Sequence, residues 1–224
     1  MDSGSSVCGR LAFACMVIVS PVAHADITVF TTEASFLAAV TAPGVDTFTG
    51  FSTTAVTNSP ITRAAGPYTY NASSATGFFG VGTVADPALS TNTDTDAITF
   101  FNLSGGASAI GGTFFGSDLQ GNFVASAVVL TATDMLGAIS TQTFVATPTS
   151  FIGFVSTGAI ATLVFSTSMP GNFVFAAVDN LVIALAQAQV TPVPEPGTWT
   201  LLLAGLAALG FCARRIRPND RSRR

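Results

Sequence analysis

Positive charge is scarce over most of this 224-residue chain. The sequence contains no lysine, and the segment 26–192 holds a single arginine, Arg63. The same segment carries nine acids, which are Asp26, Glu33, Asp46, Asp86, Asp94, Asp96, Asp118, Asp134 and Asp179. An acidic surface repels phosphate backbones, so we expect no nucleic-acid binding.

Cysteine and histidine are also absent from the segment 26–192. Cys8, Cys15 and His24 precede it, and Cys212 follows it. The segment therefore has no disulfide, no zinc site made of His or Cys, and no Ser-His or Cys-His nucleophile. A glycosidase needs two carboxylates about 5 to 9.5 Å apart, and no pattern in the sequence pairs the acids. We therefore expect a protein that is not an enzyme.

The first 25 residues show the features of a secretory signal peptide in the expected order. Arg10 supplies the positive charge, residues 11–19 form the apolar region, and Ala23-His24-Ala25 provides a cleavage site with small residues. Cleavage there would make Asp26 the first residue of the exported protein. The alternative is a buried N-terminal helix.

The stretch 197–213 is uncharged and rich in leucine. Its 17 residues would form about 25 Å of helix, slightly less than the roughly 30 Å of a hydrocarbon core. Trp199 stands where an interfacial aromatic residue is expected, and three arginines follow the stretch, namely Arg214, Arg215 and Arg217. We predict a single transmembrane helix with its basic end in the cytoplasm. The alternative is a buried helix with an exposed basic end.

A proline-rich spacer comes just before this helix. Three prolines alternate in Pro192-Val193-Pro194-Glu195-Pro196, which favours an extended strip with Glu195 exposed. The strip Val193-Pro194-Glu195-Pro196, the apolar stretch and the arginines together resemble the PEP-CTERM sorting signal of Gram-negative bacteria. The resemblance covers about residues 193–217, and the polar residues 218–224 extend beyond the end of many such tails.

This resemblance implies processing by exosortase, a membrane-embedded enzyme of cells that make exopolysaccharide and biofilm matrix. The precursor would be anchored transiently in the inner membrane, and the body would then reach the cell surface or the extracellular matrix. We therefore expect a signal peptide over 1–25, a passenger domain over 26–189 and a sorting tail over 190–224.

The passenger domain has the pattern of an all-β fold. Short apolar or β-branched runs alternate with Gly, Asn, Asp and Ser breaks about every ten residues, which favours a β-sandwich. The predicted strands are 27–30, 46–51, 68–71, 78–84, 97–103, 107–115, 123–133, 139–145, 151–155, 159–165 and 173–183 with a break. One short helix is predicted over 33–40, with Thr32 as N-cap and Phe36, Leu37 and Val40 on one face.

Three phenylalanine pairs stand out, at 78–79, 100–101 and 114–115. Successive strand residues point to opposite faces, so we expect one ring of each pair in the core and the other at an edge or under a loop. The alternative is an aromatic platform for sugars. Residues 109–118, 151–154 and 178–181 resemble the jelly-roll-like passenger domain of many PEP-CTERM proteins. This resemblance implies a β-sandwich of the kind shared with carbohydrate-binding modules, although a fold alone carries no function.

Calcium is the one cofactor for which the sequence offers candidate ligands. These oxygen donors are Asn92, Asp94, Asp96, Asp118 and Asp179. The first three have the spacing that begins a calcium loop, but Ala97 and Leu103 stand where an EF-hand needs glycine and a bidentate acid. A turn capped by Asx side chains is the alternative.

These features predict an exported, non-catalytic surface or matrix protein that associates with exopolysaccharide or binds a glycan. The alternative is a secreted glycan-acting enzyme that uses a carboxylate pair. Two acids in one concave pocket would favour the alternative.

Overall fold

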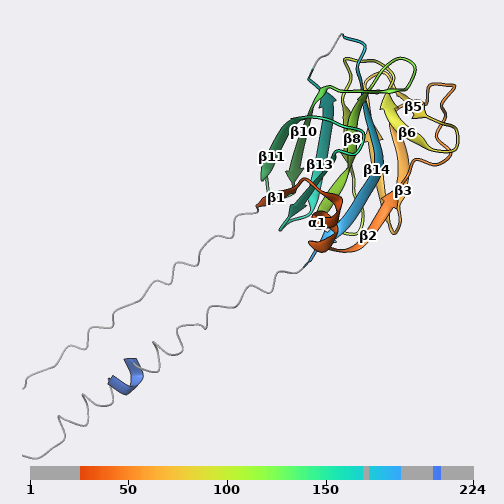
Figure 1. Cartoon of the computed structure of the whole chain (residues 1–224). Coiled ribbons are helices and arrows are strands. Elements are labelled where there is room, and N and C mark those ends of the chain that lie inside the picture. Colours follow the sequence, from red (N-terminus) through yellow and green to blue (C-terminus); the bar gives the residue numbers. More distant parts are fainter. Residues whose placement is uncertain (1–25, 169–171, 188–203, 208–224) are drawn as a thin grey trace, which may run out of the picture. The chain divides into compact units, whose positions relative to one another are not determined.

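The computed structural model describes residues 26–168, 172–187 and 204–207. Contacts divide the chain into a body that ends at Ala186 and a separate C-terminal unit, 187–224. The described part of the body consists of 14 strands and one short helix (Figure 1).

Eight strands form one antiparallel sheet, which we name sheet A. They are β1 Ile27–Phe30, β2 Val40–Asp46, β5 Phe78–Gly82, β6 Pro87–Thr91, β8 Ala109–Ser117, β9 Phe123–Val124, β12 Phe151–Ser156 and β14 Phe175–Ala186. The order is β1-β12-β8-β14-β6-β5, with β2 also paired to β14 and β9 to β8. The long strand β14 lies at the centre of this sheet because β8 pairs with one of its sides and β6 and β2 share the other.

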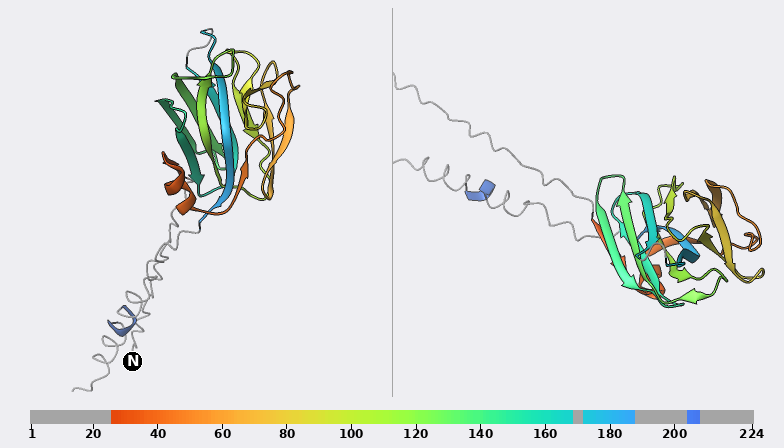
Figure 2. Two further views of the ribbon diagram at one scale, coloured as in Figure 1. Left: turned by 45° about the vertical axis from the view of Figure 1, so that its right-hand side comes forward. Right: turned by 90° about the horizontal axis from the view of Figure 1, so that it is seen from above.

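Six strands form a second antiparallel sheet, sheet B, in the order β11-β10-β13-β7-β4-β3. They are β3 Ile61–Ala65, β4 Tyr68–Ser73, β7 Ile98–Phe101, β10 Ala127–Asp134, β11 Ile139–Val145 and β13 Ile160–Thr167. The two sheets lie as layers (Figure 2), and their inner side chains share one main core. Phe114 of sheet A and Phe165 of sheet B meet edge to face there, with ring centroids 5.0 Å apart. The prediction of an all-β fold is confirmed.

The phenylalanine pairs divide between two environments, as predicted. One ring of each pair is fully buried, and these rings belong to Phe78, Phe100 and Phe114. Their neighbours Phe79, Phe101 and Phe115 lie half-buried on the other face of the same strands. The alternation of strand side chains explains this division.

The helix α1 spans Glu33–Ala38 and begins as predicted, because the Thr32 hydroxyl accepts a hydrogen bond from the Ser35 amide at 3.3 Å. Phe36 is fully buried over β12, at the place where a Cβ on Gly153 would lie. The predicted end of the helix was wrong. Val40 already belongs to β2, and Leu37 is exposed instead of sharing the buried face.

Several predicted strands also need correction. The strand predicted over 46–51 does not form, because Phe48 adopts a φ of 53° and its carbonyl accepts a hydrogen bond from the Phe51 amide in a turn. The strand predicted over 123–133 is divided into β9 and β10. The strands β2, β3 and β6 were not predicted in these positions.

Candidate functional site

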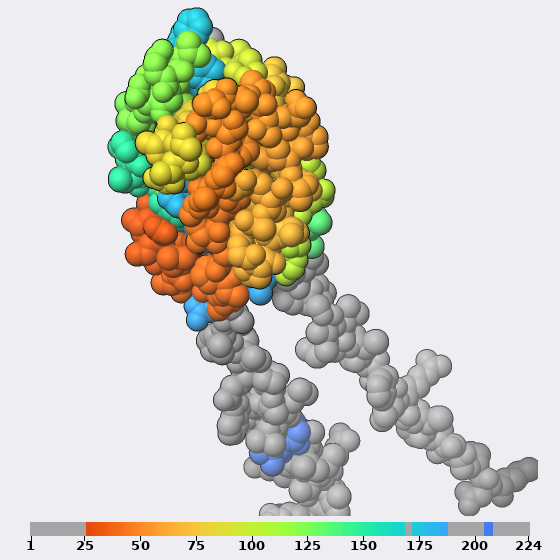
Figure 3. Space-filling model, turned by 90° about the vertical axis from the view of Figure 1, so that its right-hand side faces the viewer, coloured from red at the N-terminus to blue at the C-terminus, as the bar shows by residue number. Residues whose placement is uncertain are grey.

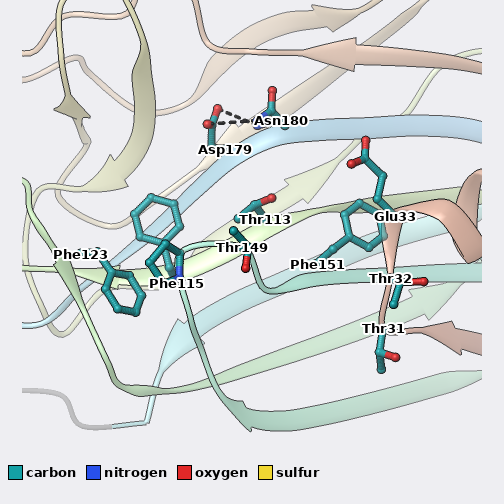
Figure 4. Close-up of a pocket in the computed structure, with 11 residues that line it drawn as sticks. Thr31, Thr32, Glu33, Thr113, Phe115, Phe123, Thr149, Phe151, Asp179 and Asn180 are labelled. Atoms are coloured by element: carbon teal, nitrogen blue, oxygen red, sulfur yellow. Dashed lines mark hydrogen bonds between the residues drawn. The ribbon is translucent and has the colours of Figure 1, made fainter.

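The outer face of sheet A carries a hollow of about 510 Å³ (Figure 4). The turn before α1, the loop before β12 and the strands β8, β12 and β14 surround it. Three aromatic rings line it, those of Phe115, Phe123 and Phe151. The rings of Phe115 and Phe123 lie 6.3 Å apart, centroid to centroid, and are tilted by 48°. Threonine hydroxyls, the Glu33 carboxylate and an Asp-Asn pair form the polar part of the lining.

A β-bulge in β14 places that Asp-Asn pair at the hollow. Asp179 pairs with Thr113 of β8, whereas the next regular pair joins Val182 to Gly111. Asn180 lies in the bulge with a φ of 50°. Its amide donates to the Asp179 carboxylate at 2.7 Å, and its side chain donates to the same group at 3.2 Å (Figure 4). The bulge therefore turns two successive polar side chains toward one site.

The pKa of Asp179, which lines this hollow, is perturbed. Burial raises the pKa of its carboxyl above the ordinary value of 3.8, the hydrogen bond from the Asn180 amide partly opposes this, and repulsion from Asp86 and Asp46 adds to the rise. Glu33, in the exposed first turn of α1, lines the same hollow. Two acids thus share one concave pocket, and the lining residues described include no basic side chain.

The five candidate calcium ligands do not converge on one point. Asp118 accepts hydrogen bonds from the amides of Gln120 and Asn122 at 2.9 and 2.8 Å, and so caps a turn. Asp179 lies at the bulge of sheet A described above. Within the ranges that the structure describes, no group of three His, Cys, Asp or Glu side chains could hold a metal ion.

All three side chains of the segment with the calcium-loop spacing form hydrogen bonds within the protein. The Asp94 carboxylate accepts from the Phe173 amide at 2.8 Å. The Asp96 carboxylate accepts from the Ser74 hydroxyl at 2.9 Å and from the amide and hydroxyl of Thr76 at 2.8 and 2.7 Å. The Asn92 side chain donates to the Thr76 carbonyl at 3.4 Å. Calcium binding stays a prediction.

Arg63 belongs to a network that sequence reasoning did not identify. Its guanidinium donates to both oxygens of Asp46, at 2.6 and 2.7 Å, and lies over the Phe48 ring at 5.2 Å. The Tyr70 hydroxyl and the Phe48 amide donate to the same carboxylate at 2.7 and 2.8 Å. The strands β2 to β4 that supply this network belong to the orange segments of Figure 3. Arg63 is therefore engaged in holding the two sheets together.

The predicted targeting residues lie outside the residues that the structure describes. They are Ala23 and Ala25 of the cleavage site, Val193, Pro194, Glu195 and Pro196 of the spacer, and Trp199, Arg214, Arg215 and Arg217 of the anchor. Within the predicted span 197–213, the described residues 204–207 are helical. Among the residues described, no helix is both long and apolar enough to cross a membrane.

Comparison with known proteins identifies one part of the chain. No curated protein and no solved structure is detectably similar to it. Residues 192–217 match the family model of the PEP-CTERM protein-sorting motif. The match covers the proline-rich spacer, the apolar stretch and the first arginines, which are the parts on which the resemblance was based. The chain therefore carries a PEP-CTERM sorting motif, which makes it an exported exosortase substrate that is anchored at the membrane before processing.

Proposed function

We propose that the exported sandwich is a non-catalytic, glycan-binding protein of the cell surface or extracellular matrix. The observation that carries this proposal is the hollow on sheet A, which combines Phe115 and Phe123 with hydroxyl groups and with the pair Asp179 and Asn180. Aromatic rings pack against the apolar faces of sugars, and carboxylate and amide groups bind sugar hydroxyls. The hollow thus offers both kinds of contact.

Charge narrows the class of glycan. The hollow has two acids and no basic side chain among its described lining residues, so an anionic polysaccharide would be repelled. Arg63 is held by Asp46 and is not part of this lining. The expected ligand is therefore a neutral, hydroxyl-rich chain. The sorting motif supports this proposal. Its resemblance to PEP-CTERM signals implies a host that has exosortase and makes exopolysaccharide.

Titration calorimetry tests binding of the exported protein to the neutral exopolysaccharide of its host. Dextran, a neutral glucan, serves as the reference polysaccharide. Phe115→Ala should raise the Kd roughly ten-fold. This is the change expected when one aromatic contact at the upper end of its usual energy range is lost. Phe101→Ala is the matched control, since Phe101 is half-buried on a strand of sheet B. Equal affinity for all three proteins would reject the hollow as the binding site.

A second candidate function, glycan hydrolysis, is favoured by one observation. Glu33 and Asp179 share the hollow, and the raised pKa of Asp179 suits a general acid. Release of reducing ends from the same polysaccharide separates the two functions. A hydrolase would lose this activity in both Asp179→Asn and Glu33→Gln while still binding the chain. The non-catalytic proposal requires that the unaltered protein releases none.

A further inference from the structure

Apart from β2, which contains Pro43, and the two-residue β9, four strands form outer edges of the two sheets, and they differ in how they are protected from other strands. In sheet A, β1 has only four residues, and β5 is covered by the segment 52–57, whose Ser52 carbonyl accepts from the Gly80 amide at 2.7 Å. In sheet B, β3 carries Arg63, a charge that points inward to Asp46. Short strands, covering segments and inward charges are known protections against edge pairing.

The fourth edge, β11, has none of these protections. It runs for seven residues, Ile139–Val145, with no charge, no proline and no register shift against β10. Within the described ranges, no strand pairs with its outer side. A long, regular and uncharged edge strand is a template for another strand.

Hydrogen bonds at both ends of the β10–β11 pair show which backbone groups are free. The Ala146 amide donates to the Ser126 carbonyl, and the Asp134 amide donates to the Ala138 carbonyl, both at 3.0 Å. Ala138 and Ala146 are both even-numbered, and hydrogen-bonded pairs alternate along an antiparallel ladder. The backbone N–H and C=O groups of the even-numbered residues of β11 therefore point toward β10. The N–H and C=O groups of the odd-numbered residues Ile139, Thr141, Thr143 and Val145 therefore point to the open edge.

The open edge is complementary to itself. If a second copy pairs with it antiparallel about Gln142, Ile139 faces Val145 of the partner subunit and Thr141 faces Thr143 of the partner subunit. Both of these facing pairs join residues whose backbone groups are free, and each pair can exchange two hydrogen bonds. Aliphatic side chains meet aliphatic ones and threonines meet threonines, which are favourable cross-strand pairs.

Charge and exposure favour contact between two copies at this edge over contact at other parts of their surfaces. The body is acidic, so two copies repel each other over most of their surfaces, but no charged residue occurs between Asp134 and Asp179. Large exposed hydrophobic side chains also gather at this edge. Ile139 and Val145, at the two ends of this strand, are each 67% exposed.

We propose that two copies of this chain associate through β11, antiparallel and about a twofold axis at Gln142. The two six-stranded B sheets then form one continuous sheet. The pairing removes the exposed edge. The proposal uses none of the side chains that line the hollow on sheet A, so this inference goes beyond glycan binding and does not depend on it.

The first test measures molar mass by sedimentation equilibrium of the full chain in detergent. Thr143→Pro removes one outward amide and leaves the ladder to β10 intact, and Thr143→Lys places a charge on the edge. Both variants should halve the molar mass of the protein component. Thr69→Lys is the matched control, since Thr69 is an exposed threonine of β4 away from this edge, and it should remain dimeric. If circular dichroism shows that the proline variant does not fold, the molar mass of Thr143→Lys alone tests the proposal.

The second test measures the register in a chain whose three native cysteines are replaced by alanine. Gln142→Cys would face its own copy at a Cα separation of about 4.5 Å, within disulfide range. Ser140→Cys, on the same face, would lie about 13 Å along the strand from its copy. Oxidation should give covalent dimers of the first variant and not of the second. A monomeric unaltered chain, a dimer that survives Thr143→Lys, or equal cross-linking of both cysteine variants would overturn the proposal.

Discussion

Replacing Asp46 with alanine removes the acceptor at the centre of the network between the two sheets. Asp46 is 5% exposed and Tyr70 is 1% exposed, while the Arg63 side chain is 22% exposed. The substitution leaves a largely buried guanidinium and a buried hydroxyl without their acceptor. It also removes the carboxylate that holds the Phe48 amide in its turn.

The expected loss follows from these contacts. Breaking a buried ion pair by removing one partner destabilises a protein by about 3 to 5 kcal/mol, and the partial exposure of Arg63 places this case near the lower limit. The unpartnered Tyr70 hydroxyl adds about 1 kcal/mol. We expect Asp46→Ala to lower the free energy of unfolding by about 4 kcal/mol. For a body of this size the melting temperature should fall by about 10 °C.

Urea unfolding followed by circular dichroism measures this loss. Tyr70→Phe removes one of the hydrogen bonds and should lower the free energy of unfolding by about 1 kcal/mol. Asp86→Ala removes an exposed carboxylate and serves as the control, with an expected change below about 0.5 kcal/mol. If Asp46→Ala is no more destabilising than Asp86→Ala, the network does not hold the sheets together and the reasoning is refuted.

The same network predicts the direction of a pH dependence. Burial raises the pKa of Asp46, but hydrogen bonds from Arg63, Tyr70 and Phe48 outweigh it and hold the pKa below its ordinary value of 3.8. A carboxyl with a lowered pKa in the folded state stabilises the fold above pH 3.8 and loses this effect as the pH falls through the folded pKa. The difference in unfolding free energy between the unaltered protein and Asp46→Ala should be constant near neutral pH and shrink below pH 3.8. If this free-energy difference grows as the pH falls, the pKa of Asp46 is not lowered in the folded state.

Four further outcomes are expected. Gly153→Ala should lower the free energy of unfolding by about 1 to 3 kcal/mol in urea, because the new Cβ meets the Phe36 ring, and adding Phe36→Leu should recover part of the loss. Asp134→Ala should lower it by about 2 kcal/mol, because the Ser156 hydroxyl and two turn amides lose their acceptor. Replacing residues 194–196 with alanine should leave export intact and abolish loss of a C-terminal tag in a host with exosortase; equal loss from the unaltered chain and the variant would reject the motif's role. Bound calcium at about 100 times its Kd would stabilise the body by roughly 2.7 kcal/mol, so equal melting temperatures in calcium and in EDTA would reject a structural ion.

The strands that the sequence predicted best are those with clear local signals. Residues 27–30 and 139–145 form strands at the predicted bounds, because alternating side chains end at polar or turn residues on both sides. The strand β2 was missed because Pro43 and Gly44 are typical of a turn after the predicted helix and not of a strand. Pro43 is tolerated there because β2 pairs with β14 alone in the described structure. Such tolerance depends on the tertiary position of a strand, which local sequence does not contain.

The hollow on sheet A depends on the same kind of non-local information. Asp179 was singled out as a ligand, and Phe115 was considered only within the alternative of an aromatic platform for sugars. Glu33 was not assigned to any site. These residues reach the hollow through strand pairings between distant segments. A local signal was nevertheless present in Asp179-Asn180, since Asn tolerates the left-handed backbone that a bulge requires. On a regular strand one of these two polar side chains would point into the apolar core, and burying it without a partner would cost about 1 to 3 kcal/mol. Two adjacent polar residues in a long apolar strand therefore indicate a bulge, and a bulge on a central strand directs both side chains to the outer face where a ligand can reach them.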